Sequence, residues 1–586
     1  MLARFDAHPL LQPTGGMDSG VYARLAADVA RGDVLLRGPG PVPYFVSPLY
    51  IYFLAAVHAL SGGSLLAAKV VQIALGTAAV GLVWGMTRRL FDDRAALVAG
   101  ILYALTGVVS FHEILILQAA LDPFLTALFL YLIAVGLTEG SFSSKVWLAA
   151  GAAGGLLALN RPNALLCVAA IAVVLAFERF RPAVALLAGT AAIVALPLAR
   201  NLIVSGEPVL ISSHGGLNFL VGNGPGANGV YRWLDGITPS VSGQAADAKK
   251  LAERETGRPL TTREVSSFFA RRAFTWVAEE PGKAARLFAR KLWYVFSNDE
   301  LSLNFSAAWY RRESVLLRLL AVGPWLLVPL GGAGLVLAVL GTGKLSGRDA
   351  AVWVSFVPVY ALLVAAFFVA TRYRLPLSVP LAAGAGGASS IVLSSLRKRD
   401  GKREQKPVLV AACVALPLFV LTLWPTGIDD GSSEEETQWV LHLIDTGEAP
   451  EAAARLNVLA KTHPTPGLLW FRVGEAWAAA GRLDDAIPAL ERSLAIDTGQ
   501  KETEKVLSAA HERRALSRAV AGDTAGALPD LEEAVRLDPS NASARLNLAA
   551  ILAEKGDRVR ARELAAEALH LRPGYEKAEA LLRALK

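Results

Sequence analysis

The sequence predicts a mostly α-helical protein in two parts, a helical body that crosses a membrane several times and a C-terminal solenoid of paired helices. Of the 586 residues 53% are hydrophobic, and the mean hydropathy of +0.42 is too high for a soluble protein. Many apolar runs approach the roughly 20 residues that a membrane-spanning helix needs. In the last quarter of the chain these runs give way to amphipathic segments punctuated by proline at a regular spacing.

The apolar runs predict a membrane body in two blocks, 67–199 and 318–425. Several runs are shorter than a full span, which favours paired, tilted or buried helices. The runs fall at about 67–87, 95–111, 115–137, 146–159, 164–178, 183–199, 318–341, 351–370, 376–396 and 407–425.

Basic residues between these runs predict the orientation of the body, because loops rich in Lys and Arg stay in the cytoplasm. The basic positions are Arg88 and Arg89, Arg179 and Arg181, Lys344 and Arg348, and the cluster from Arg397 to Lys406. Counting outward from them places residues 1–66 and 200–317 outside the cytoplasm. The C-terminal part, 433–586, is then also extracytoplasmic.

The two outer segments of the membrane part have different characters. Residues 1–66 have no cleavable signal peptide, and their apolar stretch Pro48–Leu60 is expected to lie at the membrane interface as an amphipathic helix. No predicted span precedes this outer segment. That pattern is expected of a truncated chain or of a misplaced start codon. Residues 200–317 carry Gly- and Asn-rich turns, and their length predicts an extracytoplasmic cap rather than a connector.

The C-terminal part is predicted to be an array of tetratricopeptide repeats. Pro539 and Pro573 lie 34 residues apart and each ends a two-helix unit, as Pro464 does earlier. The segment 574–586 is expected to cap the array. Counting back from Pro573 places small and aliphatic residues at the signature packing positions, which are Leu548, Ala549, Leu552, Ala561, Ala565 and Ala568.

The inner helices of this array carry apolar residues at Phe471, Leu516 and Leu546, which suits a peptide or helix partner. The alternative is an array that only packs on the membrane body. Nucleic acid is not an expected partner of the chain. Cys167 and Cys413 fall in apolar runs and have neither a disulfide framework nor metal-site spacing.

Asp18 is the first candidate for chemistry, because it precedes the membrane body at the predicted outer rim. Asp18, Tyr22 and Ala26 recur every four residues and would share one helix face. One interpretation is a carboxylate that acts on a lipid-linked substrate. The other is an N-cap of the helix that follows.

Further ionisable residues lie at or within predicted spans. His112 and Glu113 stand at an outer span end and Asp122 lies inside the next run. Burying a charge inside a membrane is costly, so an ionisable residue that stands there is expected to serve a function. The alternatives are a hydrogen-bonded helix contact for Asp122 and a solvated turn for His112 and Glu113.

Arginines gather at predicted outer span ends, where their guanidinium groups match phosphate oxygens. They are Arg161, Arg200, Arg372 and Arg374. The alternative is that some of them extend to the membrane interface only to keep their charge hydrated.

Three segments together resemble the family 39 group of GT-C membrane glycosyltransferases, which includes protein O-mannosyltransferases and aminoarabinose transferases. They are HPLLQPTGGMDSGVYARLAADVARGD, SPLYIYFLAAVHALSG and RRLFDDRAALVAGILYALTG, starting at His8, Ser47 and Arg88. The order of these motifs carries the resemblance, which covers about residues 1–425. It implies a GT-C fold in the bacterial inner membrane.

The resemblance also implies the chemistry. A hexosyl or pentosyl group would pass from a polyprenyl-phosphate carrier to a protein or glycan acceptor on the extracytoplasmic face. Asp18 matches the family's base, which takes the acceptor's proton during attack. Arg374, whose RYRLP context resembles the family's late-span motif, and the other three arginines would hold the donor phosphate.

The family has an acidic position near residue 113, which implies that Glu113 or Asp122 belongs to the acceptor site or to a metal site. His112 and Tyr22 are further candidates for the acceptor site or for an assisting role. Gly222 and Asn223 also resemble the family, although backbone geometry alone could explain them.

The chain departs from the family at Ser19, where a second acid is common. A divalent metal therefore has no clear ligand set, and the cofactor stays unknown. The alternative function is a non-catalytic role, such as transport of a lipid-linked sugar or an assembly scaffold on the same fold.

Overall fold

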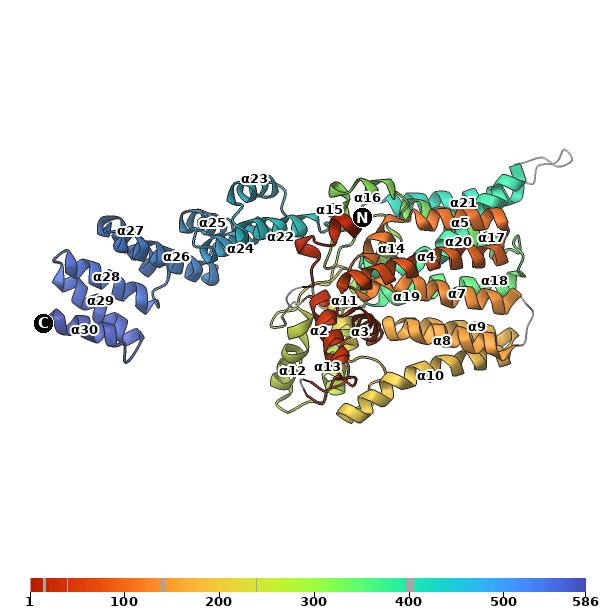
Figure 1. Ribbon diagram of the computed structural model, residues 1–586, viewed down its shortest axis with the longest axis horizontal. Helices are drawn as coiled ribbons and strands as arrows, with labels where there is room; N and C mark the ends of the chain where they lie inside the picture. Colours follow the sequence, from red (N-terminus) through yellow and green to blue (C-terminus); the bar gives the residue numbers. More distant parts are fainter. Residues whose placement is uncertain (1, 14–16, 39, 139–142, 239, 397–404) are drawn as a thin grey trace. The chain divides into compact units, whose positions relative to one another are not determined.

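The computed structural model describes the chain except for residues 1, 14–16, 39, 139–142, 239 and 397–404. Most of the basic cluster Arg397–Lys406 therefore lies outside the described residues. The chain divides into two compact units, Met1–Gly431 and Ser432–Lys586. Both are built from helices (Figure 1), which confirms the predicted fold class.

Among the described residues of the first unit, six helical segments are long and apolar enough to cross a membrane. They are α4 (Leu65–Leu90), Gln118–Thr138 with α7 (Asp122–Thr138), α10 (Phe180–Ser205), Gly347–Ala366 with α18 (Gly347–Val354) and α19 (Phe356–Ala366), α20 (Thr371–Leu396) and α21 (Gln405–Leu423). Shorter helices pack among them, including α5 (Asp93–Ala104), α8 (Ser144–Asn160), α9 (Ala164–Glu178) and α17 (Pro324–Val339).

Several predicted runs are not continuous helices, including 95–111 and 318–341. The run 95–111 breaks after α5, and a separate short helix, α6 (Gly107–Glu113), follows. The run 318–341 becomes a membrane helix only at Pro324, where α17 begins. Proline favours the first turn of a helix because that position needs no N–H donor. Hydropathy measures only how apolar a stretch is, so it missed both boundaries.

The membrane helices approach one another through small residues. A Cβ atom on Gly334 of α17 would lie 1.8 Å from the carbonyl oxygen of Gly384 in α20. A Cβ on Gly151 of α8 would lie 2.0 Å from the Leu186 carbonyl oxygen in α10. Only glycine permits such close backbones, and small residues at helix interfaces are how membrane helices gain van der Waals contact.

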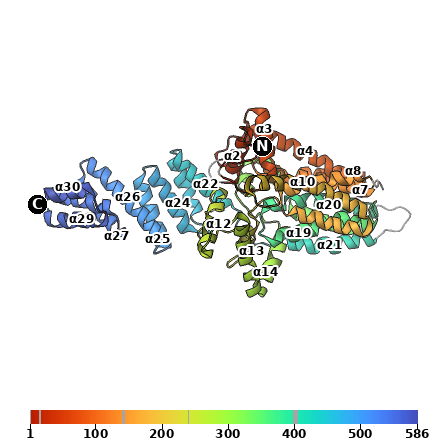
Figure 2. The ribbon, with the colours of Figure 1, turned by 90° about the horizontal axis from the view of Figure 1, so that it is seen from below.

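The remaining helices of this unit gather at one end of the bundle (Figure 1). They are α1 (Leu2–Phe5), α2 (Asp18–Ala30), α3 (Leu49–Ser61), α11 (Gly215–Gly222), α12 (Val241–Thr256), α13 (Thr262–Glu279), α14 (Pro281–Phe296), α15 (Ala307–Glu313) and α16 (Val315–Leu319). A second view agrees for α2, α12 and α13 (Figure 2). Leu217, Leu220 and Phe269 form part of a separate core that joins α11 to α13.

The second unit is a series of helix pairs followed by a single helix. The helices are α22 (Ser432–Asp445), α23 (Ala449–Leu459), α24 (Pro466–Ala479), α25 (Leu483–Ile496), α26 (Lys501–Val520), α27 (Thr524–Leu537), α28 (Ala542–Glu554), α29 (Arg558–Leu571) and α30 (Glu576–Ala584). The predicted packing residues Ala561, Ala565 and Ala568 are fully buried. Leu546, predicted on the inner surface, is instead buried in a core with Ala568 and Ala578.

A buried ionic cluster joins α26 to α27. Asp530 accepts hydrogen bonds from Arg514 at 2.6 Å and Arg518 at 2.8 Å, and its Oδ1 lies 2.8 Å from Nδ1 of His511. Asp530 is only 4% exposed. Removing one partner of such a buried group leaves the other charge uncompensated, so this repeat depends on the whole set.

Candidate active site

Asp18 begins helix α2 and faces the first turn of α20. Nη1 of Arg372 donates a 2.6 Å hydrogen bond to Oδ2 of Asp18, and both side chains are largely buried. The N-cap of α2 is Met17, so Asp18 does not cap the helix with its side chain. The capping interpretation of Asp18 is therefore wrong.

The surroundings of Asp18 keep its carboxylate ionised. Burial raises the pKa of Asp18, but the Arg372 guanidinium and the neighbouring Asn304 side chain more than offset this, and the net pKa is lowered. Asn304 has a positive φ of +79°, which asparagine tolerates better than most residues. A strained backbone of this kind often accompanies a functional position.

Arg161 approaches the same region from the end of α8. Its Nε donates to Oδ2 of Asp122 at 2.6 Å, and Asn160 donates to Oδ1 of Asp122 at 2.6 Å. Asp122 is fully buried. Its carboxylate is thus occupied in orienting Arg161, while Nη2 of Arg161 is buried without a hydrogen-bond partner among the described residues.

Both arginines lie close to the ring of Tyr373. The guanidinium carbon of Arg161 is 4.7 Å from the centre of the Tyr373 ring, and that of Arg372 is 5.3 Å from it. Nε of Arg372 is also buried and without a partner in the described part of the chain. Two positive groups that each retain an unused N–H donor can hold an anion such as a phosphate.

Two neighbouring cavities connect these residues. One, of about 80 Å³, is lined by Asp18, Tyr22 and Arg372, and the other, of about 140 Å³, by Arg161 and Tyr360. Residues that line both are Ser47, Gln118, His214, Asn218, Phe368 and Tyr373. The structure therefore brings Asp18, Tyr22, Arg161 and Arg372 to one site, with Asp122 directly behind it.

Polar residues from distant loops complete the site. Tyr22 donates a 2.6 Å hydrogen bond to Oε1 of Gln118, and Nε2 of His214 lies 2.7 Å from Nδ2 of Asn218. Burial lowers the pKa of His214 to about 4, so the ring is neutral at physiological pH. Sequence reasoning missed Gln118, His214 and Asn218, because they stand in apolar or Gly-rich stretches without a motif.

Two predicted phosphate ligands have other contacts. Arg200 donates to the carbonyl oxygens of Leu35, Leu36 and Val42. Arg374 donates to the carbonyl oxygens of Tyr294, Ser297 and Asp299. Neither arginine lines the Asp18 cavities. A buried carbonyl oxygen needs a hydrogen-bond donor. Each arginine supplies donors to the carbonyl oxygens of a loop and so holds that loop in place.

His112 and Glu113 also lie outside these cavities. His112 is buried with Nδ1 2.8 Å from the carbonyl oxygen of Val108. The Glu113 carboxylate lies against Gly76 of α4, where a Cβ would come within 1.9 Å of Oε1. The Glu113 carbonyl accepts from Gln72 at 2.8 Å. The structure does not bring this pair together with Asp18.

Lys291 of α14 holds together two segments that lead to the site. Its Nζ donates to the carbonyl oxygens of Gly222 and Phe367 and to Oδ1 of Asn223. A Cβ on Gly222 would lie 2.2 Å from the Phe367 carbonyl oxygen. Gly222 and Asn223 thus hold the segment that carries Phe367 and Phe368 to the cavities. Lys291 itself gave no signal in the sequence.

Residues 43–201 match the family described as dolichyl-phosphate-mannose-protein mannosyltransferase. Residues 437–501 and 521–585 match tetratricopeptide repeats. The chain carries a mannosyltransferase-like membrane domain followed by tetratricopeptide repeats. No curated protein matches the chain in a sequence search.

Among solved structures, the archaeal oligosaccharyltransferase AglB from Archaeoglobus fulgidus is 16% identical with a TM-score of 0.37, over 73% of this chain and 54% of that one. The MamA protein is 20% identical with a TM-score of 0.20, over 26% of this chain and 81% of that one. YrrB, described as a tetratricopeptide protein with an unusual peptide-binding site, is 18% identical with a TM-score of 0.20, over 34% of this chain and 91% of that one.

The matched part of the mannosyltransferase-like domain includes Asp122 and Arg161 but neither Asp18 nor Arg372. The pairing of Asp18 with Arg372 is therefore a finding of the tertiary structure. Among the described residues, no group of three or more His, Cys, Asp or Glu side chains is arranged to hold a metal ion.

Proposed function

We propose that this protein transfers a hexosyl or pentosyl group from a polyprenyl-phosphate carrier to a protein or glycan acceptor on the extracytoplasmic face of a bacterial inner membrane. The observation that carries the proposal is the buried pair of Asp18 and Arg372, beside Arg161 with its unused N–H donor. A carboxylate for the acceptor and two guanidinium groups for the donor phosphate thus lie around one pair of cavities.

Asp18 is the proposed catalytic base. The acceptor hydroxyl or amine attacks the anomeric carbon, and its proton passes to a carboxylate oxygen of Asp18. The bond between that carbon and the carrier phosphate breaks at the same time, and the phosphate leaves with the bonding electrons. Because the pKa of Asp18 is lowered, the proton moves late, once attack has made the acceptor acidic.

Arg161 and Arg372 are the proposed phosphate ligands. Charge accumulates on the phosphate as the sugar leaves, and fixed positive groups aimed at that charge stabilise the transition state. Asp122 orients Arg161 through its 2.6 Å bond to Nε and leaves Nη2 for the ligand. Arg372 contacts both the base and, in this proposal, the phosphate, so it links the donor to the acceptor side.

The tetratricopeptide repeats are proposed to bind a peptide or protein outside the cytoplasm. Repeat arrays of this kind present extended surfaces to partners. In this interpretation the repeats recruit an acceptor protein or a partner enzyme, while the chemistry takes place at Asp18.

Transfer by reconstituted full-length protein tests the proposal. Polyprenyl-phosphate mannose and polyprenyl-phosphate aminoarabinose serve as hexose and pentose probes, with periplasmic extract as the source of acceptor. Radiolabel should move from lipid to protein or glycan with the wild type and not with Asp18→Asn. Label that crosses the bilayer while still attached to its carrier would instead support the transport alternative.

A further inference from the structure

Helix α14 is fixed to the ends of membrane helices at the end of the bundle that carries the Asp18 site. Nε1 of Trp293 donates to the carbonyl oxygen of Leu421 in the last turn of α21, at 3.1 Å. Nζ of Lys291 donates to the carbonyl oxygen of Phe367, directly after α19 ends, at 2.7 Å. One end of α14 is therefore held at the ends of two membrane helices.

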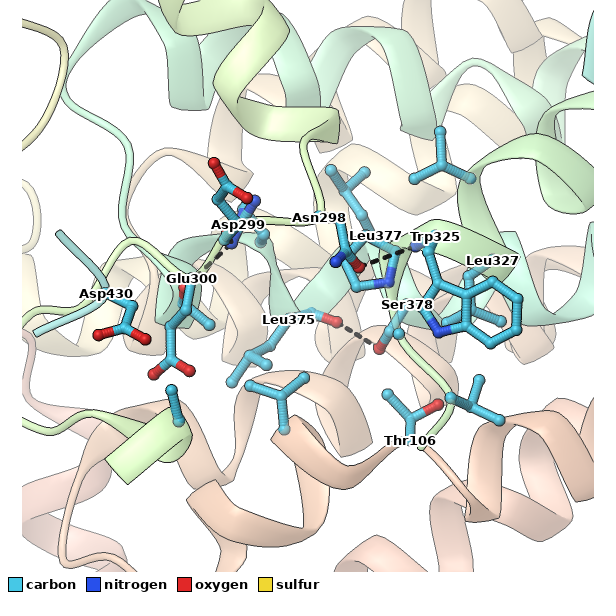
Figure 3. Close-up of a pocket in the computed structure, with 18 of the residues that line it drawn as sticks. Thr106, Asn298, Asp299, Glu300, Trp325, Leu327, Leu375, Leu377, Ser378 and Asp430 are labelled. Carbon is cyan, nitrogen blue, oxygen red and sulfur yellow. Dashed lines mark hydrogen bonds between the residues drawn. The ribbon is translucent and has the colours of Figure 1, made fainter. Parts of the chain in front are cut away.

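Asn298, two residues after α14 ends, adds two further anchors. Its backbone N–H donates to the carbonyl oxygen of Thr422 in α21 at 2.8 Å. Its Oδ1 accepts from the backbone N–H of Trp325 in the first turn of α17, at 3.2 Å, and Figure 3 shows this bond. Trp293 and Trp325 thus stand where membrane helices end, and tryptophan is enriched at membrane interfaces. This level corresponds to the headgroup region of a bilayer.

From these anchors α14 extends away from the bundle. Figure 2 shows α14 running across the direction of the long membrane helices. A helix at headgroup level that runs across the spans lies along the membrane surface, where it meets lipid headgroups.

The side chains of α14 divide into an apolar strip and a basic strip. Phe288, Leu292 and Phe296 recur every four residues and share one face, and Phe288 is 36% exposed. Arg286 and Arg290 are also four residues apart, on a different face, and both are exposed. Aromatic and aliphatic residues on one face with arginine on another are typical of helices that lie in a membrane interface.

The charge of α14 is positive throughout. The helix contains no acid and four basic residues, which are Lys283, Arg286, Arg290 and Lys291. Lys291 is turned into the protein, and Lys283 pairs with Glu280 before the helix at 2.9 Å. Arg286 has one hydrogen bond, to a carbonyl oxygen of its own helix. Neither Arg286 nor Arg290 forms an ion pair with any residue that the structure describes.

We propose that α14 binds anionic phospholipids of the phosphatidylglycerol class at the membrane surface. Phe288 and Leu292 contact the acyl chains just below the headgroups, and Arg286 and Arg290 contact the headgroup phosphates, whose oxygens match the guanidinium fork. A zwitterionic lipid presents the same phosphate with a compensating ammonium, so it gains less from the two arginines. This surface is separate from the Asp18 cavities and does not depend on sugar transfer.

Fluorescence quenching of the full-length protein in nanodiscs tests this surface. An environment-sensitive dye is attached to Phe288→Cys in a Cys413→Ser background, where the remaining Cys167 is buried. The nanodiscs consist of phosphatidylcholine with a minor fraction of lipid that carries brominated acyl chains. Brominated phosphatidylglycerol should quench the dye with an apparent affinity roughly tenfold or more above that of brominated phosphatidylcholine. Equal quenching by the two lipids, or none by either, would overturn the proposal.

Paired substitutions assign the preference to the two arginines. Arg286→Gln with Arg290→Gln should remove it, whereas lysine at both positions should keep most of it, because the charge remains. Lys250→Gln with Arg254→Gln is the matched control, since these residues are exposed and four apart on α12. High salt should weaken the preference, as expected for exposed charges. The proposal fails if the control pair loses the preference as the α14 pair does, or if the α14 glutamine pair retains it.

Discussion

Arg372 and Asp18 are 354 residues apart in the chain, yet they meet in a hydrogen bond of 2.6 Å. The first stands in the opening turn of α20 and the second in the opening turn of α2. The pair joins the N-terminal segment to the last part of the membrane unit. The ion pair also favours the charged form of both side chains.

Asp18→Asn should abolish sugar transfer while leaving expression and membrane insertion unchanged. Asparagine keeps the shape of the side chain but cannot accept the proton, and a general base contributes typically 10²–10⁴-fold to a rate. Initial rates with donor and acceptor both supplied are the measurement. Asp28→Asn is the matched control, because Asp28 lies on the same helix and its carboxylate pairs, within the described part of the chain, only with exposed Arg31. Near-normal turnover by Asp18→Asn would rule out its role as base.

The pH profile should respond to Arg372. A carboxylate with a lowered pKa is ionised in the wild type down to acidic pH, so activity that needs it is present above that pKa and is lost as the pH falls through it. In Arg372→Gln the main lowering influence is gone and burial raises the pKa. The acidic limb of kcat/KM should therefore move to higher pH. A limb that stays in place would show that Asp18 does not control it.

Arg161→Ala should weaken use of the donor, by roughly tenfold or more if one charge-assisted contact to phosphate is lost. Arg161→Lys should restore only part of it, because the ammonium lacks the planar fork. Apparent donor affinity at saturating acceptor is the measurement. If only the acceptor kinetics change, Arg161 does not contact the donor.

Arg374→Ala should act on stability rather than on donor affinity. The change leaves carbonyl oxygens of Tyr294, Ser297 and Asp299 without their donor, and each unsatisfied buried acceptor costs roughly 1–3 kcal/mol. Thermal unfolding in detergent should therefore occur at lower temperature. An unchanged unfolding temperature together with weaker donor use would return Arg374 to the phosphate site.

Labelling by an impermeant thiol reagent tests the orientation, in a background without Cys413. Val520→Cys in the repeat unit, at a position 90% exposed, should be labelled from outside the cell. Arg348→Cys, whose parent side chain is 83% exposed, lies in a predicted cytoplasmic loop and should react only after the membrane is permeabilised. The opposite pattern would reverse the orientation and place Asp18 on the cytoplasmic face.

Local patterns in the sequence determined the fold class of this protein. Apolar runs, prolines 34 residues apart and small packing residues such as Ala561 each reflect the immediate environment of a residue, so they are legible without a structure. Asp18 and Arg161 were also found this way, because a charge beside an apolar run is conspicuous.

The tertiary structure alone decided which charged residues lie together. Four arginines look alike in sequence, because each stands at the end of an apolar run. They are Arg161, Arg200, Arg372 and Arg374. Arg161 and Arg372 retain unused donors at a cavity, whereas Arg200 and Arg374 spend theirs on loop carbonyls. The role of a guanidinium depends on which acceptors surround it, and those acceptors come from segments far away in the chain. Sequence spacing cannot report them, because the contacts exist only after the helices have packed.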